Sequence, residues 1–479
     1  LWSCLSLGDY PIEELDVLWK ILMINQFHDI IPGSSINLVY QTTHKEYEQI
    51  HQGCDDLISK AAKLLFKEDA DSFVLANTLS YEWKGAVKLP TSFQGHELLD
   101  QNGTSVPLQK TDEGVLAAVD LEPLSFSTFK KGVSITLEVQ RSNDLVLEND
   151  LIRYEFASNG TLRSSYDKQL EKEFMSGDGN VFSLYEDRPN NWDAWDVDFF
   201  YRDALIETAE ITQANSCSSG EVVQQLRFIF NIGKSTIEQM VSLDPRSKRL
   251  DFSTKVDWKE SHKMLRVHFP VNVRSEQASF DIQYGHVKRN THRNTSWDKA
   301  KFEVVGHKYA DISDHDNGVA LLNDCKYGYM VHDDLLDLNL LRSPSNPDPD
   351  ADRGSHVFTY GLLPHQDDLI HSNVIRESSC LNQGPMLFEG MASEIDIPLK
   401  LIGEGMELTV LKKAEKEDAW ILRVVETHGR VSSGSVQLKG MITECDIMEW
   451  NELGDPQAVE DSFPLTLEPF EIKTYKVTY

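Results

Sequence analysis

A change in the spacing of apolar residues near Ser72 constrains the fold more than any other feature of the sequence. Before this point, apolar residues recur at mainly three- and four-residue steps, which is the spacing of one buried helical face. After it, short apolar or alternating runs such as FVLAN, SITLEV and LRVHFPVNV are separated by clusters of Gly, Asn, Asp and Pro. Because no helical periods intervene, packed antiparallel sheets are favoured over a doubly wound α/β fold. The predicted fold class is mainly β with an N-terminal helical segment: a helix-bundle portion followed by antiparallel β-sandwich domains.

The N-terminal segment is predicted to form two antiparallel helices. Pro11 suits the first turn of the first helix, which should end near Phe27 because a Pro-Gly pair follows. Ser34 and Ser35 offer an N-cap for a second, long amphipathic helix that reaches Leu65. Such a hairpin would form part of a helix bundle. The face of the first helix that should be buried consists of Ile12, Leu15, Leu18, Trp19, Leu22 and Phe27.

Composition divides the chain into four predicted domains. They are a helix-bundle segment at 1–68, a small β domain at 69–131, a large β-sandwich domain at 132–390 and a C-terminal β-sandwich domain at 391–479. The clearest long loop is SPSNPDPDADRG, from Ser343 to Gly354, whose prolines and aspartates no strand would tolerate. Loops on rigid sheets are where binding residues concentrate. The chain opens on Leu1 in a stretch that reads like the middle of a fold, so a fragment or a processed chain is expected.

The charge and cysteine content exclude several classes of partner. The formal net charge of −31 would repel phosphate backbones and anionic lipid surfaces, so neither nucleic acid nor membrane is expected as a partner. A neutral glycan would meet no such repulsion. Six cysteines are spread singly, with no C-x-x-C pair, and no signal peptide is visible, which favours a reducing compartment and hence the cytoplasm.

The first candidate for chemistry is the pair His28-Asp29, which closes a buried helix immediately before a tight turn. A side chain there could enter a cleft and bind a metal. The alternative is that a histidine in a last helical turn interacts favourably with the helix dipole. The local pattern alone favours this second interpretation.

The segment LWKILMINQFHDIIPGSS resembles the helix-bundle segment of glycoside hydrolase family 38, the class II α-mannosidases. Further blocks in the same order, NTLSYEWKG, NNWDAWDV, YGHVKRNTHRNTSWDKAKFEV, LLNDCKYGY and TYGLLPH, are similar to the cytosolic, 2C1-type branch of that family. The resemblance runs through nearly the whole chain. It implies a zinc-dependent retaining enzyme that hydrolyses terminal α-D-mannosyl residues of oligosaccharides. The catalytic α/β domain would lie upstream of residue 1 and form a partner of this chain, and a homo-oligomer is a further alternative.

The family pattern assigns individual residues by resemblance. His28 matches the bundle histidine that supplies the fourth ligand of one zinc ion, for which cobalt could substitute, and Asp29 matches a neighbour that hydrogen-bonds sugar hydroxyls. Arg353, with Gly354, resembles a loop that reaches the bound sugar, although Arg353 could instead simply offset the aspartates beside it. The chain has no G-H-x-H-x-D block, so no catalytic nucleophile or general acid is expected within it, and alone it should be inactive. The H-x-D triplets at His332 and His365 are predicted to be surface groups.

Two further clusters are candidates for roles in the sugar site. Asp193, Trp195 and Asp196, together with Trp192, combine flat aromatic faces with carboxylates, a usual means of binding a pyranose, although tryptophans buried in a sandwich core are equally common. Glu426 and His428 in VVETHG are predicted to be structural. Two other functions compete with the enzyme: a non-catalytic carbohydrate-binding β-sandwich protein, which would need no metal, and a purely structural assembly fragment.

Overall fold

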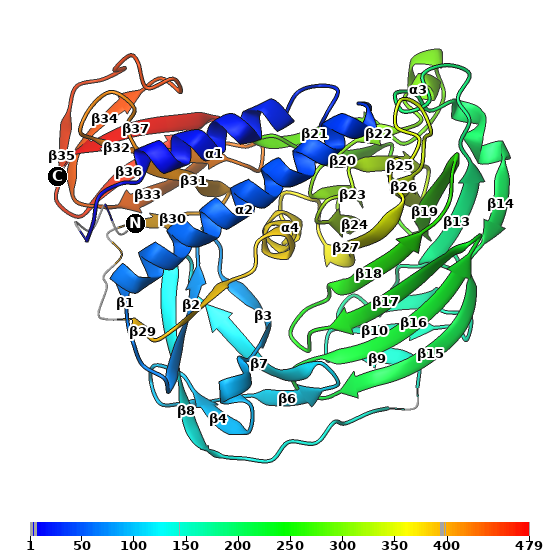
Figure 1. The fold of residues 1–479 in the computed structure, drawn as a ribbon, viewed down its shortest axis with the longest axis horizontal. Coiled ribbons are helices and arrows are strands. Elements are labelled where there is room, and N and C mark those ends of the chain that lie inside the picture. The colour runs from blue at the N-terminus through cyan, green and yellow to red at the C-terminus, as the bar shows by residue number, and fades with distance from the viewer. Residues whose placement is uncertain (1–2, 4–6, 143, 393–396, 398, 479) are drawn as a thin grey trace.

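The structure is a computed structural model that describes residues 3, 7–142, 144–392, 397 and 399–478. Its helices α1 (Ile12–Asn25) and α2 (Asn37–Leu65) form an antiparallel hairpin that lies across the β domains (Figure 1). Leu18 packs into the contact between them at Gly53, where an added Cβ would lie 2.8 Å from Leu18 Cδ2. Asn25 donates to Glu46 Oε2 across the hairpin at 2.7 Å. The two predicted helices are therefore present.

Two details of the helical prediction are wrong. Of the six apolar residues expected on the buried face of α1, only Leu18 is buried, whereas Trp19 is 59% and Phe27 54% exposed. The β domains of this chain cover only one side of the hairpin. The N-cap of α2 is Ile36, whose apolar side chain makes no capping bond, and the Ser34 hydroxyl instead donates to the carbonyl oxygen of Asp29 at 3.5 Å.

A small sandwich follows the helices. Its core contains Phe73, Leu98 and Phe129 from one sheet and Ala117 and Val119 from the other. The first sheet contains, in order, β28 (Met386–Glu389), β2 (Ser72–Asn77), β8 (Ser125–Ser134), β4 (His96–Leu99) and β5 (Ser105–Val106), and the second β3 (Trp83–Lys88), β7 (Gly114–Leu121) and β6 (Leu108–Thr111).

Strand β28 belongs to this small sandwich, because it pairs with β2 along Phe73–Ala76. The sequence assigned residues 386–389 to the large domain instead. The chain returns to the small sandwich from the large one, and a local apolar pattern carries no signal for pairing between segments so far apart. A two-stranded sheet of β1 (Phe66–Lys67) and β29 (Met391–Ala392) continues this return at the end of α2.

The large domain has one hydrophobic core to which three sheets contribute. Ile152 comes from a four-stranded sheet, Phe252 from a nine-stranded sheet and Val267 from a six-stranded sheet. The nine-stranded sheet has the order β15 (Glu210–Ser219), β16 (Gln224–Ile232), β17 (Ser235–Leu243), β18 (Leu250–Trp258), β27 (Gly354–Gln366), β24 (Asn317–Asn323), β23 (Tyr309–Ser313), β20 (Gln277–Ile282) and β21 (Gly285–Asn290). The six-stranded sheet has the order β14 (Leu205–Thr208), β13 (Val181–Glu186), β19 (Lys263–Pro270), β26 (Leu335–Arg342), β25 (Gly328–His332) and β22 (Val304–Val305). The four-stranded sheet has the order β12 (Lys172–Glu173), β11 (Leu162–Asp167), β10 (Ile152–Phe156) and β9 (Val146–Glu148).

The C-terminal sandwich packs a three-stranded sheet on a five-stranded one. The first has the order β30 (Lys400–Ile402), β33 (Ser432–Gln437) and β36 (Ser462–Leu467), and the second β31 (Met406–Lys413), β32 (Trp420–Glu426), β37 (Ile472–Thr478), β34 (Gly440–Cys445) and β35 (Gln457–Val459). Tyr10, just before α1, packs edge-on against Trp420 with ring centroids 6.0 Å apart. The start of the helical hairpin is thus attached to this sandwich.

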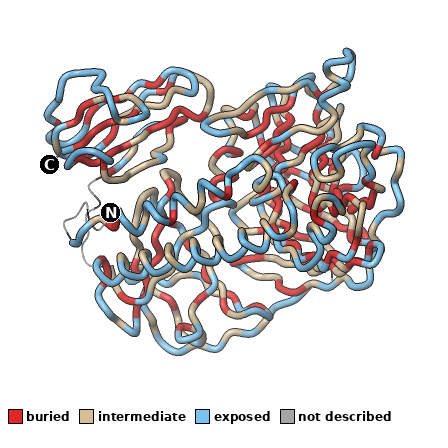
Figure 2. Tube along the Cα trace, turned by 45° about the horizontal axis from the view of Figure 1, so that its top comes forward, coloured by how far each residue is buried: buried red, intermediate tan, exposed pale blue. Residues whose placement is uncertain are grey.

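Buried residues concentrate in the strands of the sandwiches, whereas the helical hairpin is largely exposed (Figure 2). All described sheet pairings between strands are antiparallel. The predicted fold class is confirmed. No helix in the described ranges is both long enough and apolar enough to span a membrane.

Candidate active site

The turn between α1 and α2 presents His28 and Asp29 to solvent. The His28 side chain is 70% exposed, and its Nε2 lies 3.4 Å from Asp29 Oδ2. Tyr40 supports the turn from behind, because its hydroxyl donates to the carbonyl oxygen of Asp29 at 3.2 Å. Gly33 completes the turn with a positive φ of 81°, which favours glycine. The backbone of the turn is therefore fixed while both side chains stay free to contact a ligand.

The acidic loop predicted between Ser343 and Gly354 docks on the start of α2. Asn37 Nδ2 donates to both carboxylate oxygens of Asp348, at 3.1 and 3.2 Å, and Asp348 is only 5% exposed. Burial raises the pKa of Tyr40, and the negative charges of Asp348, Asp352 and Asp29 raise it further. Asn37 and Tyr40 thus join the His28-Asp29 turn to the acidic loop.

Arg353 lies at the end of this loop, just before β27. Its Nη1 donates to Asp350 Oδ1 at 3.1 Å, and the side chain is 44% exposed. Within the described part of the chain, its other guanidinium nitrogens have no polar partner. The pairing with Asp350 supports the charge-offset interpretation, while the remaining donors leave room for a ligand. Burial raises the pKa of Asp352, its neighbour.

Asp193 attaches the tryptophan-containing segment to the same loop. Its Oδ2 accepts from the backbone N–H of Ser345 at 2.5 Å and of Asn346 at 3.1 Å. Arg342, at the end of β26, donates to the carbonyl oxygens of Asp193 and Asp196, the latter at 2.8 Å. The Asp193 carboxylate thus holds the loop, which is a different use from the sugar contact predicted for it.

The tryptophans beside Asp193 are exposed. Trp192 is 75% and Trp195 63% exposed, so the alternative that they fill a sandwich core is wrong. Asp196 is exposed as well, and its Oδ1 accepts from the backbone N–H of Val197 at 3.0 Å. Trp195 and Asp196 remain accessible to a ligand, as a sugar-binding role would require.

His365 is a buried residue, which corrects the prediction that it lies on the surface. It is 3% exposed, and its Nε2 lies 2.8 Å from Oδ1 of the buried Asp311. The prediction failed because His365 lies in strand β27 and its side chain pairs with Asp311 from another strand of the same sheet, a contact that the local sequence does not show. His332 is half-buried and lies 3.2 Å from the carboxylate of Asp333, its sequence neighbour.

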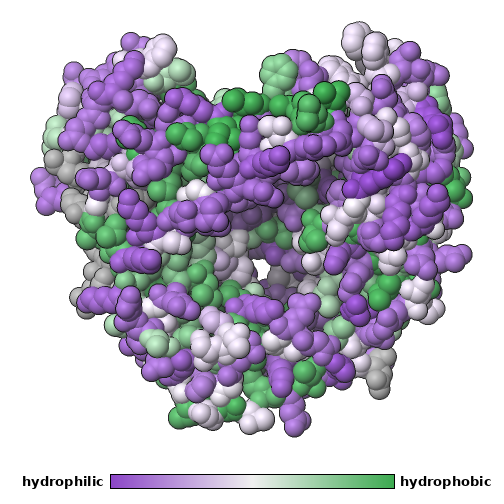
Figure 3. Space-filling view, in the orientation of Figure 1, coloured by the Kyte–Doolittle hydropathy of each residue, from purple (hydrophilic) through white to green (hydrophobic). Residues whose placement is uncertain are grey.

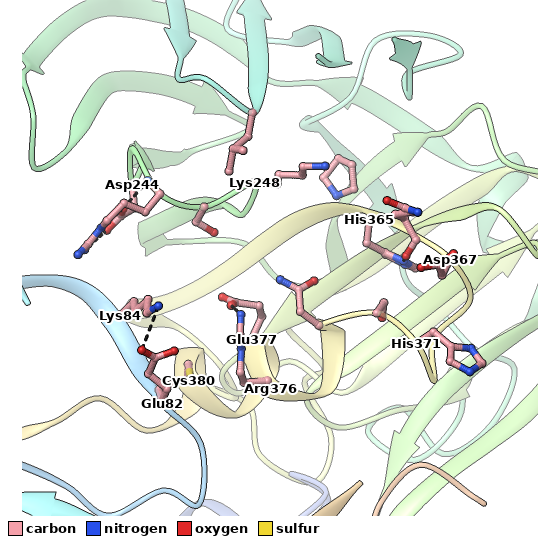
Figure 4. Close-up of a pocket in the computed structure, with 17 residues that line it drawn as sticks. Glu82, Lys84, Asp244, Lys248, His365, Asp367, His371, Arg376, Glu377 and Cys380 are labelled. Carbon is pink, nitrogen blue, oxygen red and sulfur yellow. Dashed lines mark hydrogen bonds and ion pairs between the residues drawn. The ribbon is translucent and has the colours of Figure 1, made fainter. Parts of the chain in front are cut away.

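His365 and Asp367 line a cavity of about 360 Å³ where the small sandwich, the large domain and the short helix α4 (Val374–Asn382) meet (Figure 4). Charged groups around the cavity pair with one another, as Lys84 does with Glu82 at 3.0 Å. The cavity therefore has mixed polarity and no excess of cationic groups that would select an anion. It lies on a different part of the molecule from the His28-Asp29 turn.

Glu426 has the surroundings of a structural residue. It is fully buried, and its carboxylate accepts from the backbone N–H groups of His428, Gly429 and Phe470, at 2.7 to 2.9 Å. The hydroxyl of Ser432 donates to it as well. Glu426 therefore fixes the turn after β32, as the sequence interpretation proposed, and burial lowers the pKa of His428 beside it.

The described residues contain no group of three or more His, Cys, Asp and Glu side chains that could together hold a metal ion. The chemistry of the turn nevertheless fits a contribution to a metal site, because an exposed imidazole and a carboxylate are both ordinary zinc ligands. His28 could supply one ligand of such a site. The sequence pattern singled out His28 and Arg353, which stay predictions, but it did not single out Asn37, Tyr40 and Asp348, through which the structure connects their two segments. The only available signal was the acidic loop itself.

The sequence matches three described domain families in chain order. Residues 3–65 match the alpha mannosidase middle domain, residues 147–350 the glycosyl hydrolases family 38 C-terminal domain, and residues 405–475 the glycosyl hydrolases family 38 C-terminal beta sandwich domain. The α-mannosidase of Enterococcus faecalis V583 shares the fold, with a TM-score of 0.80 at 16% identity over 98% of this chain and 64% of that one. The helical hairpin, most of the large domain and the C-terminal sandwich thus match domains described for glycosyl hydrolases of family 38.

Curated relatives give the finer assignment. The chain is 34% identical to human alpha-mannosidase 2C1, in an alignment that covers 97% of this chain and 45% of the relative. It is 32% identical to alpha-mannosidase G of Dictyostelium discoideum, in an alignment that covers 98% of this chain and 48% of that protein. It spans about half the length of these relatives. The chain belongs to glycosyl hydrolase family 38, and the predicted resemblance to the 2C1-type branch is confirmed.

Proposed function

We propose that this chain is part of an α-mannosidase that removes terminal α-D-mannosyl residues from oligosaccharides by zinc-dependent, retaining hydrolysis in the cytoplasm. The observation that carries this proposal is the joining of the His28-Asp29 turn to the acidic loop through Tyr40, Asn37 and Asp348. It connects an exposed imidazole and carboxylate with the loop that bears the half-exposed guanidinium of Arg353. These are groups suited to a metal and to sugar hydroxyls.

Each residue has a separate task in the proposed reaction. His28, as a neutral imidazole, would donate a lone pair to zinc, and Asp29 would accept hydrogen bonds from sugar hydroxyls. Arg353 would donate to the sugar through the guanidinium nitrogens that Asp350 does not use. Zinc, when bound, would act as a Lewis acid on the hydroxyl oxygens of the mannose. The two carboxyl groups that a retaining glycosidase needs, about 5 Å apart, would come from an N-terminal α/β domain.

The exposed face of α1 supports the proposal of such a partner domain. Ile12, Trp19 and Met23 recur at seven- and four-residue steps on α1, so they form one stripe, and each is 48% to 63% exposed. Phe27, just beyond the end of the helix, is 54% exposed as well. Hydrophobic atoms gather along this upper edge of the molecule (Figure 3). A contiguous apolar stripe on a soluble protein marks an interaction surface. We infer that the α/β domain covers it, completing the helix bundle.

The five cysteines in the described part of the chain are all free, which supports the proposed reducing compartment. The test of the function is hydrolysis of a chromogenic α-mannoside by the product of the complete open reading frame, with its zinc content measured in parallel. Turnover together with about one zinc per site, the single-ion count that the proposal requires, would support the enzyme. Binding of mannose oligosaccharides without hydrolysis or zinc would instead indicate the non-catalytic carbohydrate-binding alternative.

A further inference from the structure

The segment between β13 and β14 exposes a group of large aromatic side chains that no core residue covers. Trp192 and Trp195 are 75% and 63% exposed, and Phe199 and Phe200 in the following 3₁₀ turn (Phe199–Asp203) are 52% and 42% exposed. Exposed aromatic groups of this size and density on a soluble protein mark a binding surface. Trp192 also has a positive φ of 59°, which is unfavourable for a bulky residue and is tolerated where the surroundings fix the backbone.

The segment is anchored at both of its ends. At the start, Arg342 Nε donates to the carboxylate of Asp187 at 2.7 Å, and the same guanidinium donates to the carbonyl oxygens of Asp193 and Asp196. At the end, Arg202 Nη1 donates at 3.1 Å to Asp337, which is 1% exposed and also accepts from the fully buried Arg266 at 2.6 Å. The rings are therefore exposed on a fixed backbone. A pre-positioned ring loses little conformational freedom when a ligand stacks on it.

The aromatic segment is continuous with the proposed active site through the acidic loop. Asp193 holds the loop at Ser345 and Asn346, and Asn37 holds it at Asp348, two residues further on. Two residues of chain span at most about 7 Å, so both attachments lie on one short stretch of loop. The tryptophans are thus placed beside the site that would receive the terminal mannose.

We propose that Trp192 and Trp195 form an aromatic platform that binds the sugar residues next to the terminal mannose of an oligosaccharide substrate. This inference rests on the proposed function and adds the recognition of the rest of the glycan. The apolar C–H face of a pyranose can pack on an indole ring, and the exposed carboxylate of Asp196 can accept from its hydroxyls. The acidic surroundings, with Asp193, Asp196 and Asp198 within one segment, select a neutral ligand over an anionic one.

The test compares two substrates of the complete enzyme, a mannose pentasaccharide and a nitrophenyl α-mannoside that has no second sugar. In the double variant Trp192→Ala and Trp195→Ala, kcat/KM for the pentasaccharide should fall about tenfold or more, while the value for the nitrophenyl substrate stays within about twofold. Trp195→Phe, which keeps a ring, should recover part of the loss. Trp450→Ala is the control, because Trp450 is equally exposed at 63% but lies in the C-terminal sandwich.

Equal losses of kcat/KM on both substrates, or no loss on either, would contradict the proposed platform. So would a change in oligomeric state of the double variant with unchanged kinetics, because the rings would then form a protein interface. Pentasaccharide binding, measured by isothermal titration calorimetry, separates this inference from the proposed function. If the enzyme hydrolyses neither substrate, the proposed function fails, and the platform then stands only if binding is saturable and is lost in the double variant.

Discussion

His28 and His365 are both paired with an aspartate, yet their surroundings give them different capacities. His28 is 70% exposed and lies 3.4 Å from Asp29, so its ring can turn toward a ligand. His365 is buried and its Nε2 is occupied by Asp311 at 2.8 Å. Burial alone would lower the pKa of His365, but the charge and hydrogen bond of Asp311 outweigh it and raise the pKa. At the scale of the residue, the partner and the exposure decide what a histidine can do.

On the proposed function, replacing His28 with alanine should abolish mannosidase activity in the complete enzyme and lower its zinc content. The reason is that the imidazole would be one of a small set of ligands, and losing one weakens the site strongly. Activity on a nitrophenyl α-mannoside and metal analysis measure the effect. His371→Ala is a matched control, because His371 is also exposed and paired with an aspartate in a turn, at 2.7 Å. Normal activity with normal metal in His28→Ala would contradict the assignment.

Stability should decrease as the pH rises through the pKa of His365. The pKa of His365 in the folded protein is raised above the usual value of 6.5. The contribution of its protonated form to the free energy of unfolding is therefore fully present below pH 6.5, and it is lost as the pH rises through the folded-state pKa and the folded protein releases the proton. Urea unfolding at pH 6 and pH 8 should show a larger free energy of unfolding at pH 6. In Asp311→Asn the difference between the two pH values should shrink. An unchanged difference would show that other groups control it.

Arg353→Ala should raise KM or lower kcat for α-mannosides without unfolding the protein. The side chain is 44% exposed, so its loss should change the free energy of unfolding by less than about 0.5 kcal/mol, while a donor to the sugar would be missing. Steady-state kinetics and thermal melting measure the two effects. Arg141→Ala, an exposed arginine paired with Asp112 in another part of the chain, is the control. A lower Tm with unchanged kinetics would assign Arg353 a structural role.

At the scale of the element, one contact carries the organisation of the site: the start of α2 holds the loop between β26 and β27 through Asn37 and Asp348. Asn37→Ala would leave the buried carboxylate of Asp348 with fewer donors, which costs about 1–3 kcal/mol. We expect a lower Tm together with reduced activity, because the loop that carries Arg353 loses its attachment. Gln49→Ala, an exposed amide further along α2, should change neither. Full activity in Asn37→Ala would show that the attachment of this loop to α2 is not needed for activity.

The sequence predicted helices and strands well, because the spacing of apolar residues within each segment indicates them. It predicted poorly the contacts between segments that lie far apart in the chain. The helical hairpin and the strands follow from apolar spacing, and His28 and Arg353 follow from family resemblance. The pairing of β28 with β2, the docking of Asp348 on α2 and the burial of His365 depend on segments far apart in the chain. No local pattern encodes such contacts. The tryptophans next to Asp193 show the same limit, since the sequence could not decide whether they are exposed or buried.

At the scale of the whole molecule, the sandwiches have cores of their own, while the helical hairpin lacks cover on one side. Three large clusters of buried hydrophobic residues lie within the small, large and C-terminal sandwiches. Only Leu18 and Asn25 of α1 are buried. The β part should therefore fold without any other domain, and the hairpin should be the region of lowest local stability. Hydrogen exchange should show fast exchange in α1 and slow exchange in the strands.

On the proposed function, the chain by itself should be folded but should not hydrolyse mannosides, because a single imidazole cannot hold zinc tightly and neither carboxyl group of the retaining pair is available. Adding a separately expressed N-terminal α/β domain should restore turnover and should slow hydrogen exchange along the stripe of Ile12, Trp19 and Met23, since that stripe becomes its interface. Trp19→Asp should prevent both effects, whereas Leu453→Asp, at an exposed residue of the C-terminal sandwich, should prevent neither. Turnover by the chain alone would place the nucleophile within it, with Asp193, Asp196 and Asp324 as the carboxylates to replace first.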